Sequence, residues 1–74
     1  MQHPIVTNVR EANQWLKRAG VTQLKFSSKQ DQMYGKVFEL KQQLGNGSWV
    51  TLVSSPGLGE CVEHAHHYFS IPYC

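Results

Sequence analysis

Long apolar runs, cysteine-rich patterns and an export signal are all missing from this sequence. No stretch approaches the roughly 18 apolar residues of a membrane span, and the chain does not open with a basic segment followed by an apolar run. Its only two cysteines are Cys61 and Cys74, whereas small disulfide-held scaffolds usually carry about four or more. We therefore expect a soluble, cytoplasmic protein with reduced thiols and no membrane partner.

Positive charge is absent from the part of the chain that follows Lys41. All seven lysines and arginines lie between Arg10 and Lys41, and Glu60 and Glu63 are the only formally charged residues after them. No run of basic residues reaches three, so the sequence offers no dense tract for phosphate binding. The net charge of +2 thus combines a basic first part with an acidic, histidine-rich last part.

Hydrophobic residues are plentiful enough for a folded core. They make up 41% of the 74 residues, which excludes a disordered tail and leaves room for one domain only. We expect residues 1–74 to form a single small globular domain, near the lower size limit for a fold held by its core alone.

Asn8 and Glu11 predict the start of a helix. Their spacing is that of a capping box, in which both side chains bind amide groups that the first helical turn leaves unpaired. Lys17 and Arg18 suit the negative end of the helix dipole, and Gly20 favours the left-handed residue that ends a helix. The apolar stripe consists of Val9, Ala12, Leu16 and Ala19, with Trp15 beside it.

Three strands are predicted between Gly20 and the Ser54–Gly59 loop. Leu24 and Phe26 alternate with polar residues, as do Phe38 and Leu40 in the segment that follows a polar turn at 27–32. The glycines of 45–47 suit a hairpin that leads into a third strand at 48–54. The expected inward residues are Leu24, Phe26, Phe38, Leu40, Val50 and Leu52, and we also expect Trp15 and Tyr34 to be largely buried.

The segment 60–69 is predicted to be a helix, because Val62, Ala65 and Phe69 are three and four residues apart. Because Val62, His64, His66 and Tyr68 also alternate, a strand is the other interpretation. The fold class is thus α+β: a two-layer sandwich of order α-β-β-β-α, with a three-stranded antiparallel sheet and both helices on one face.

This order of elements is similar to that of the double-stranded RNA-binding domain, whose second helix opens with a lysine cluster that grips phosphates. The present chain has Glu60 and Glu63 at the corresponding place. The resemblance is therefore one of topology and carries no function with it.

The cluster ECVEHAHHYF (60–69) has three interpretations. On a helix, Glu60, Glu63, His64 and His67 face away from the apolar stripe, so the simplest interpretation is a solvated polar face. A catalytic site would pair Cys61 with His64, but free cysteine is commonly buried and a buried thiol is inert. A zinc site would use Cys61, His64, His67 and Cys74, whose spacing differs from the usual zinc-finger patterns.

Trp49 points to a binding surface on the sheet. If Phe38 and Leu40 face the helices, then Val37, Glu39, Lys41, Trp49 and Val53 face outward, and an exposed tryptophan among valines and charges has the composition of a binding hot spot. A register displaced by one residue would instead return Trp49 to the core.

We expect a small non-catalytic binding protein with no cofactor, acting through protein–protein contacts as an inhibitor or regulator of a larger partner. Small accessory proteins of phages and mobile elements often act in this way, by occlusion. A homodimer is a further possibility. The first alternative is a nucleic-acid-binding module that uses Arg10, Lys17, Arg18 and Lys25. The second is a small zinc-binding protein built on the Cys/His cluster.

Overall fold

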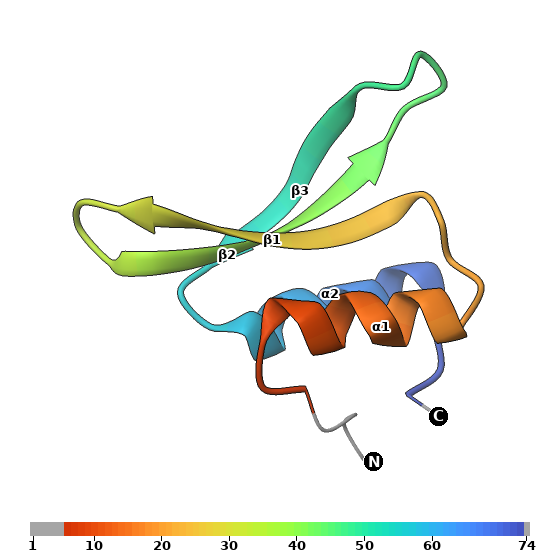
Figure 1. Cartoon of the computed structure of the whole chain (residues 1–74), viewed down its shortest axis with the longest axis horizontal. Coiled ribbons are helices and arrows are strands. Elements are labelled where there is room, and N and C mark those ends of the chain that lie inside the picture. The colour runs from red at the N-terminus through yellow and green to blue at the C-terminus, as the bar shows by residue number, and fades with distance from the viewer. Residues whose placement is uncertain (1–5, 74) are drawn as a thin grey trace.

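The computed structural model describes residues 6–73 and shows two helices on one side of a three-stranded antiparallel sheet (Figure 1). The elements follow the predicted order α-β-β-β-α, and the sheet order is β1-β2-β3. Helix α1 packs mainly on β1, whereas α2 packs on β2 and β3. Neither helix of the described part is long and apolar enough to cross a membrane. The bounds are α1 Val9–Arg18, β1 Leu24–Asp31, β2 Gly35–Gln43, β3 Trp49–Ser55 and α2 Leu58–Phe69.

Helix α1 begins at the predicted cap. The side chain of Asn8 accepts a hydrogen bond from the Glu11 N–H at 2.9 Å. The Glu11 carboxylate reaches back to Thr7, one residue earlier than in the standard capping box, and accepts from both its N–H and its hydroxyl. These bonds lower the pKa of Glu11. At the other end Gly20 has a φ of +78°, the left-handed conformation expected there.

The first strand is longer than the sequence indicated. Residues 27–31, predicted to lie in a turn, continue β1 and pair with β2, and the turn is confined to 32–34. The prediction was wrong because this hairpin projects beyond the helices (Figure 1) and has no need of an apolar alternation. The turn is closed by Asp31, whose carboxylate accepts from the N–H groups of Tyr34 and Met33, and both bonds lower its pKa.

A β-bulge divides β3 into two halves. Leu40 pairs with Val53 but Lys41 pairs with Thr51, so Leu52 is an extra residue in the ladder. Val53 consequently lies on the helix side, opposite Leu40, and its predicted outward position was wrong. Strict alternation along the strand could not reveal this reversal, because the extra residue shifts the phase in the middle of the strand.

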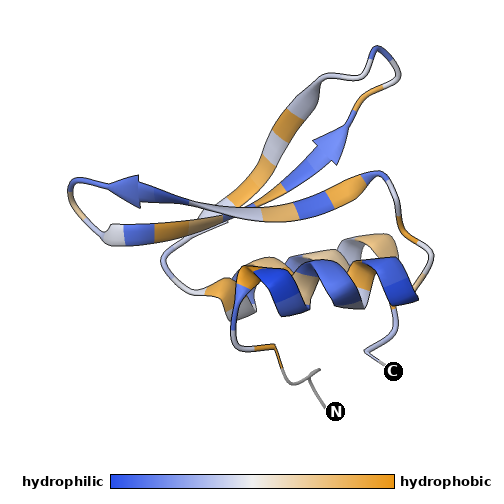
Figure 2. Cartoon of the chain, in the orientation of Figure 1, coloured by the Kyte–Doolittle hydropathy of each residue, from blue (hydrophilic) through white to orange (hydrophobic). Residues whose placement is uncertain are grey.

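The core lies between the sheet and the two helices. Trp15 is buried as predicted, whereas Tyr34 is 67% exposed at the tip of the β1–β2 hairpin. Val50 is also exposed, because the β2–β3 hairpin extends past the helices (Figure 1). Figure 2 shows hydrophobic and hydrophilic residues alternating along the strands. The core cluster contains Ala12, Trp15, Leu16, Leu24, Phe26, Leu40, Leu58, Cys61, Val62, Ala65 and Ile71.

Residues 60–69 form a helix, as predicted, and the chain then turns back toward α1. Ser70 adopts a left-handed conformation with φ 54°, which ends α2. This turn buries Ile71 and brings the carbonyl oxygen of Pro72 to 2.9 Å from Trp15 Nε1, which donates a hydrogen bond to it. The C-terminal segment thereby joins α1 to α2.

Asn13 protects the outer edge of β1. Its side-chain amide donates to the Phe26 carbonyl at 3.0 Å and accepts from the Phe26 N–H at 2.8 Å. These are the two bonds that a residue of a neighbouring strand would make. A helix side chain thus occupies part of an edge that could otherwise pair with another chain.

We predict that Asn13→Ala lowers the free energy of unfolding by about 1–2 kcal/mol, because it removes two hydrogen bonds from a half-buried strand edge. Denaturant unfolding monitored by tryptophan fluorescence would measure the change. Gln14→Ala, on the exposed side of the same helix, is the matched control and should stay within about 0.5 kcal/mol of the unsubstituted protein. Equal losses for the two variants would contradict the role of Asn13.

Candidate functional site

The face of the sheet turned away from the helices is the first candidate site (Figure 1). Its side chains have the phase opposite to that of the core residues Phe26 and Leu40, and the strand register places them side by side. We call this surface the outer sheet face. It comprises Lys25, Ser27, Lys29, Val37, Glu39, Lys41, Trp49 and Thr51.

Trp49 lies on the outer sheet face, near the start of β3. It pairs with Gln43 rather than with a core residue, and its side chain is partly exposed. The ammonium group of Lys25 lies 4.3 Å from the centre of its ring, which is cation–π geometry. The register expected from the sequence therefore holds for this half of β3, and a cation and a large aromatic ring share one position on the surface.

Glu39 connects the lysines of the outer sheet face. One carboxylate oxygen lies 3.4 Å from Lys29 Nζ and the other 3.8 Å from Lys41 Nζ. The residue is only 7% exposed, although no helix covers this face, and Val37 beside it is 5% exposed. Long lysine side chains cover apolar neighbours with their methylene groups while keeping their charges in water. The result is a surface on which the ammonium groups of Lys29 and Lys41 flank one shielded carboxylate.

Ser27 and Lys29 belong to this surface although the sequence reasoning assigned them to a turn. Ser27 pairs with Glu39, and among the described residues its buried hydroxyl oxygen has no hydrogen-bond partner. Lys29 pairs with Val37. No apolar alternation marks Ser27 and Lys29 as part of a strand, because Ser28 and Gln30 on its other face are polar as well.

The four basic residues proposed for nucleic-acid binding do not share one surface. Arg10, Lys17 and Arg18 are exposed on α1, in the helical layer, whereas Lys25 lies on the opposite side of the sheet above Trp49. A phosphate backbone crossing α1 would therefore not reach Lys25. The basic charge of this chain is distributed over two faces, of which the outer sheet face also carries an aromatic ring.

The histidine-rich helix α2 presents a shallow hollow to solvent. It encloses about 430 Å³ and is lined by Val53 together with the polar face of α2: Glu60, Glu63, His64, His67 and Tyr68. His64 stacks on Tyr68 at 4.3 Å, and His67 meets the same ring edge-on at 5.3 Å. These contacts agree with a solvated polar face on which the imidazoles pack against a tyrosine.

His66 has a different environment. Its Nδ1 lies 2.6 Å from the carbonyl oxygen of Ile71, and because that oxygen only accepts, Nδ1 carries the proton. The imidazole ring stacks on Tyr73 with the ring centres 3.8 Å apart. His66 thus holds the C-terminal segment in place and points away from the hollow beside α2.

Cys61 lies inside the protein and is separated from the exposed histidines. It is fully buried, and its thiol donates to the Phe38 carbonyl oxygen at 3.5 Å. Burial raises its pKa to about 11, with the carboxylates of Glu60 and Glu39 contributing. A thiol in this state is a poor nucleophile and a poor metal ligand.

The proposed zinc ligands are not assembled within the described part of the chain. Cys61 faces the core, His64 and His67 line the hollow, and Cys74 lies outside the described residues. Across residues 6–73, no group of three or more histidine, cysteine, aspartate or glutamate side chains is arranged to hold a metal ion.

Similarity to known proteins gives no indication of what this chain binds. No protein-family model, no curated protein and no solved structure matches this chain. The arrangement of α-β-β-β-α therefore describes the fold class, and any function must be inferred from the surfaces described above.

We predict that the Cys61 thiol does not react with Ellman's reagent in mildly alkaline buffer while the protein is folded, because little thiolate forms below its raised pKa of about 11. The experiment uses the Cys74→Ser variant, so that the release of thionitrobenzoate reports one thiol. Addition of guanidinium chloride should release one equivalent. Reaction at the same rate before and after unfolding would contradict the buried position.

Proposed function

We propose that this protein is a non-catalytic binding protein that contacts a larger protein through its outer sheet face and regulates or inhibits it by occlusion, as small proteins of phages and mobile elements do. The observation that carries the proposal is the position of Trp49, under the ammonium group of Lys25 on a face that no helix covers. Tryptophan is enriched among residues that dominate interface energies.

The charge of the outer sheet face indicates the chemistry of the partner. Lys25, Lys29 and Lys41 outnumber the single carboxylate of Glu39, which is already engaged by two of them. An acidic protein surface with an apolar patch for Trp49 would complement this arrangement. Two copies of the same face would bring like charges together, so a different protein is favoured over a homodimer.

The sheet edges support binding by the face rather than by strand addition. Asn13 occupies the hydrogen-bonding groups of Phe26 on the β1 edge, and the bulge at Leu52 interrupts the regular ladder of β3. Both devices discourage a foreign strand from pairing with the sheet. Binding without catalysis is supported by the position of Cys61, whose thiol is turned into the core and away from any substrate.

The test is a pull-down from lysate of the source organism with the protein immobilised, performed with and without nuclease. We expect retention of one protein that is insensitive to nuclease and is lost with Trp49→Ala and with Lys25→Glu. An interface tryptophan of this kind contributes about 2 kcal/mol or more, which corresponds to a loss of affinity of roughly thirtyfold. Thermal unfolding of both variants would establish that they remain folded.

Tyr68→Ala is the matched control, because Tyr68 is a large exposed aromatic residue on α2, outside the outer sheet face. Its substitution should leave retention unchanged. Loss of all retained material after nuclease treatment would identify nucleic acid as the ligand instead. Retention that is equally strong in the two sheet-face variants would place the interface elsewhere on the molecule.

A further inference from the structure

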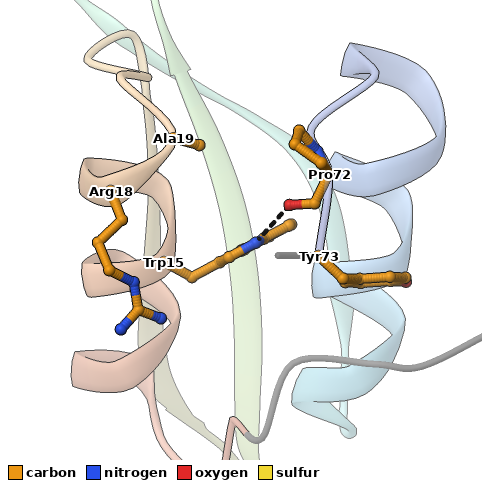
Figure 3. A pocket seen from close by; sticks show the side chains of 5 residues that line it. All are labelled: Trp15, Arg18, Ala19, Pro72 and Tyr73. Carbon is orange, nitrogen blue, oxygen red and sulfur yellow. Dashed lines mark hydrogen bonds between the residues drawn. The ribbon is translucent and has the colours of Figure 1, made fainter.

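A second hollow lies between the end of α1 and the C-terminal segment, in the helical layer of the molecule and away from the outer sheet face. It encloses about 420 Å³, which is within the size range of small-molecule sites. Figure 3 shows the side chains around it: Trp15, Arg18 and Ala19 come from α1 and the residue after it, and Pro72 and Tyr73 come from the C-terminal segment.

Aromatic rings fix the shape of this pocket. The indole of Trp15 is held by its hydrogen bond to the Pro72 carbonyl oxygen (Figure 3), and it stacks with Tyr73 at 5.8 Å and 24°. Tyr73 is in turn stacked on His66, and Trp15 on Phe26. Because each ring is held by the next, the pocket exists before any ligand binds, and little conformational entropy is lost on binding.

Among the described residues that line the pocket, Arg18 alone is charged. Its side chain is exposed, and within residues 6–73 no carboxylate forms an ion pair with its guanidinium group. The neighbouring Lys17 adds a second positive charge to this end of α1 but does not line the pocket. This guanidinium group, which no carboxylate of residues 6–73 engages, lies beside aromatic and aliphatic walls and suits an anionic group, because it offers several donors to a carboxylate.

We propose that this pocket binds an aromatic carboxylate, with the ring of the ligand against Trp15, Pro72 and Tyr73 and its carboxylate on Arg18. The same chemistry is found in a free aromatic acid and in the C-terminal aromatic residue of a peptide. This site is independent of the outer sheet face, so the failure of either proposal leaves the other intact.

The experiment is a titration of the isotopically labelled protein with hydrocinnamate, followed by the indole N–H signals in nitrogen–proton NMR spectra. The two tryptophans give separate reporters: Trp15 lines the pocket, and Trp49 lies on the other side of the sheet as an internal reference. We expect a saturable shift of the Trp15 signal and none of the Trp49 signal. Hydrocinnamide, which has the same ring without the charge, should bind about tenfold more weakly or not at all.

Paired variants separate the pocket from general electrostatics. Arg18→Gln and Lys17→Gln each remove one positive charge from the same end of α1, but only Arg18 lines the pocket. We expect Arg18→Gln to weaken hydrocinnamate binding about tenfold and Lys17→Gln to leave it within about twofold. Ala19→Leu should abolish binding by filling the space. Folding of every variant is established by the unchanged Trp49 signal.

Three results would overturn the proposal: no shift of the Trp15 signal, equal binding of acid and amide, or equal effects of the two charge removals. The source of the ligand is distinguished by a third compound, the peptide Ala-Ala-Phe with a free C-terminus. Tighter binding of this peptide than of hydrocinnamate would assign the site to peptide ends. Weaker binding would assign it to free aromatic acids.

Discussion

The hydrogen bond from Trp15 to the Pro72 carbonyl is the contact on which the helical layer depends. Helix α1 packs on β1 and α2 packs on β2 and β3, so the helices are supported by different parts of the sheet. Trp15 connects them, because its indole binds the C-terminal segment and stacks with Tyr73 and Phe26. In a chain of 74 residues the core is small, so one buried tryptophan fills a substantial part of it.

Much of the fold could be predicted because local signals and hydrophobic pattern agreed. Asn8 and Gly20 mark the two ends of α1 by hydrogen bonding and backbone conformation, which are properties of single residues. The polar end of β1 could not be predicted, since a hairpin arm with both faces in water has no apolar alternation. The side of the sheet occupied by Val53 was also hidden, because the bulge at Leu52 arises from pairing with β2 and has no sequence signature of its own.

The candidate sites also differ in how far they could be predicted from the sequence. Trp49 was visible in the sequence because alternation along the predicted strands placed it on the face opposite to Phe38 and Leu40. The pocket at Arg18 could not be predicted, since it joins the end of α1 to residues more than fifty positions later in the chain. The histidine cluster attracted attention in the sequence, yet the fold separates its members: His66 binds the Ile71 carbonyl, while His64 and His67 pack on Tyr68.

The extra residue in β3 also constrains how this sequence can change over evolutionary time. Trp49 follows the alternation of the outer half of the strand, and Val53 follows the alternation of the half beside α2. Loss of a single codon at Leu52 would remove the extra residue and restore one continuous alternation, in which Trp49 would still face outward and Val53 would still face the helices. Closing the bulge at the present length would instead put Trp49 and Val53 on the same face, so the strand should tolerate the loss of this one residue more readily than a change that closes the bulge and keeps the length.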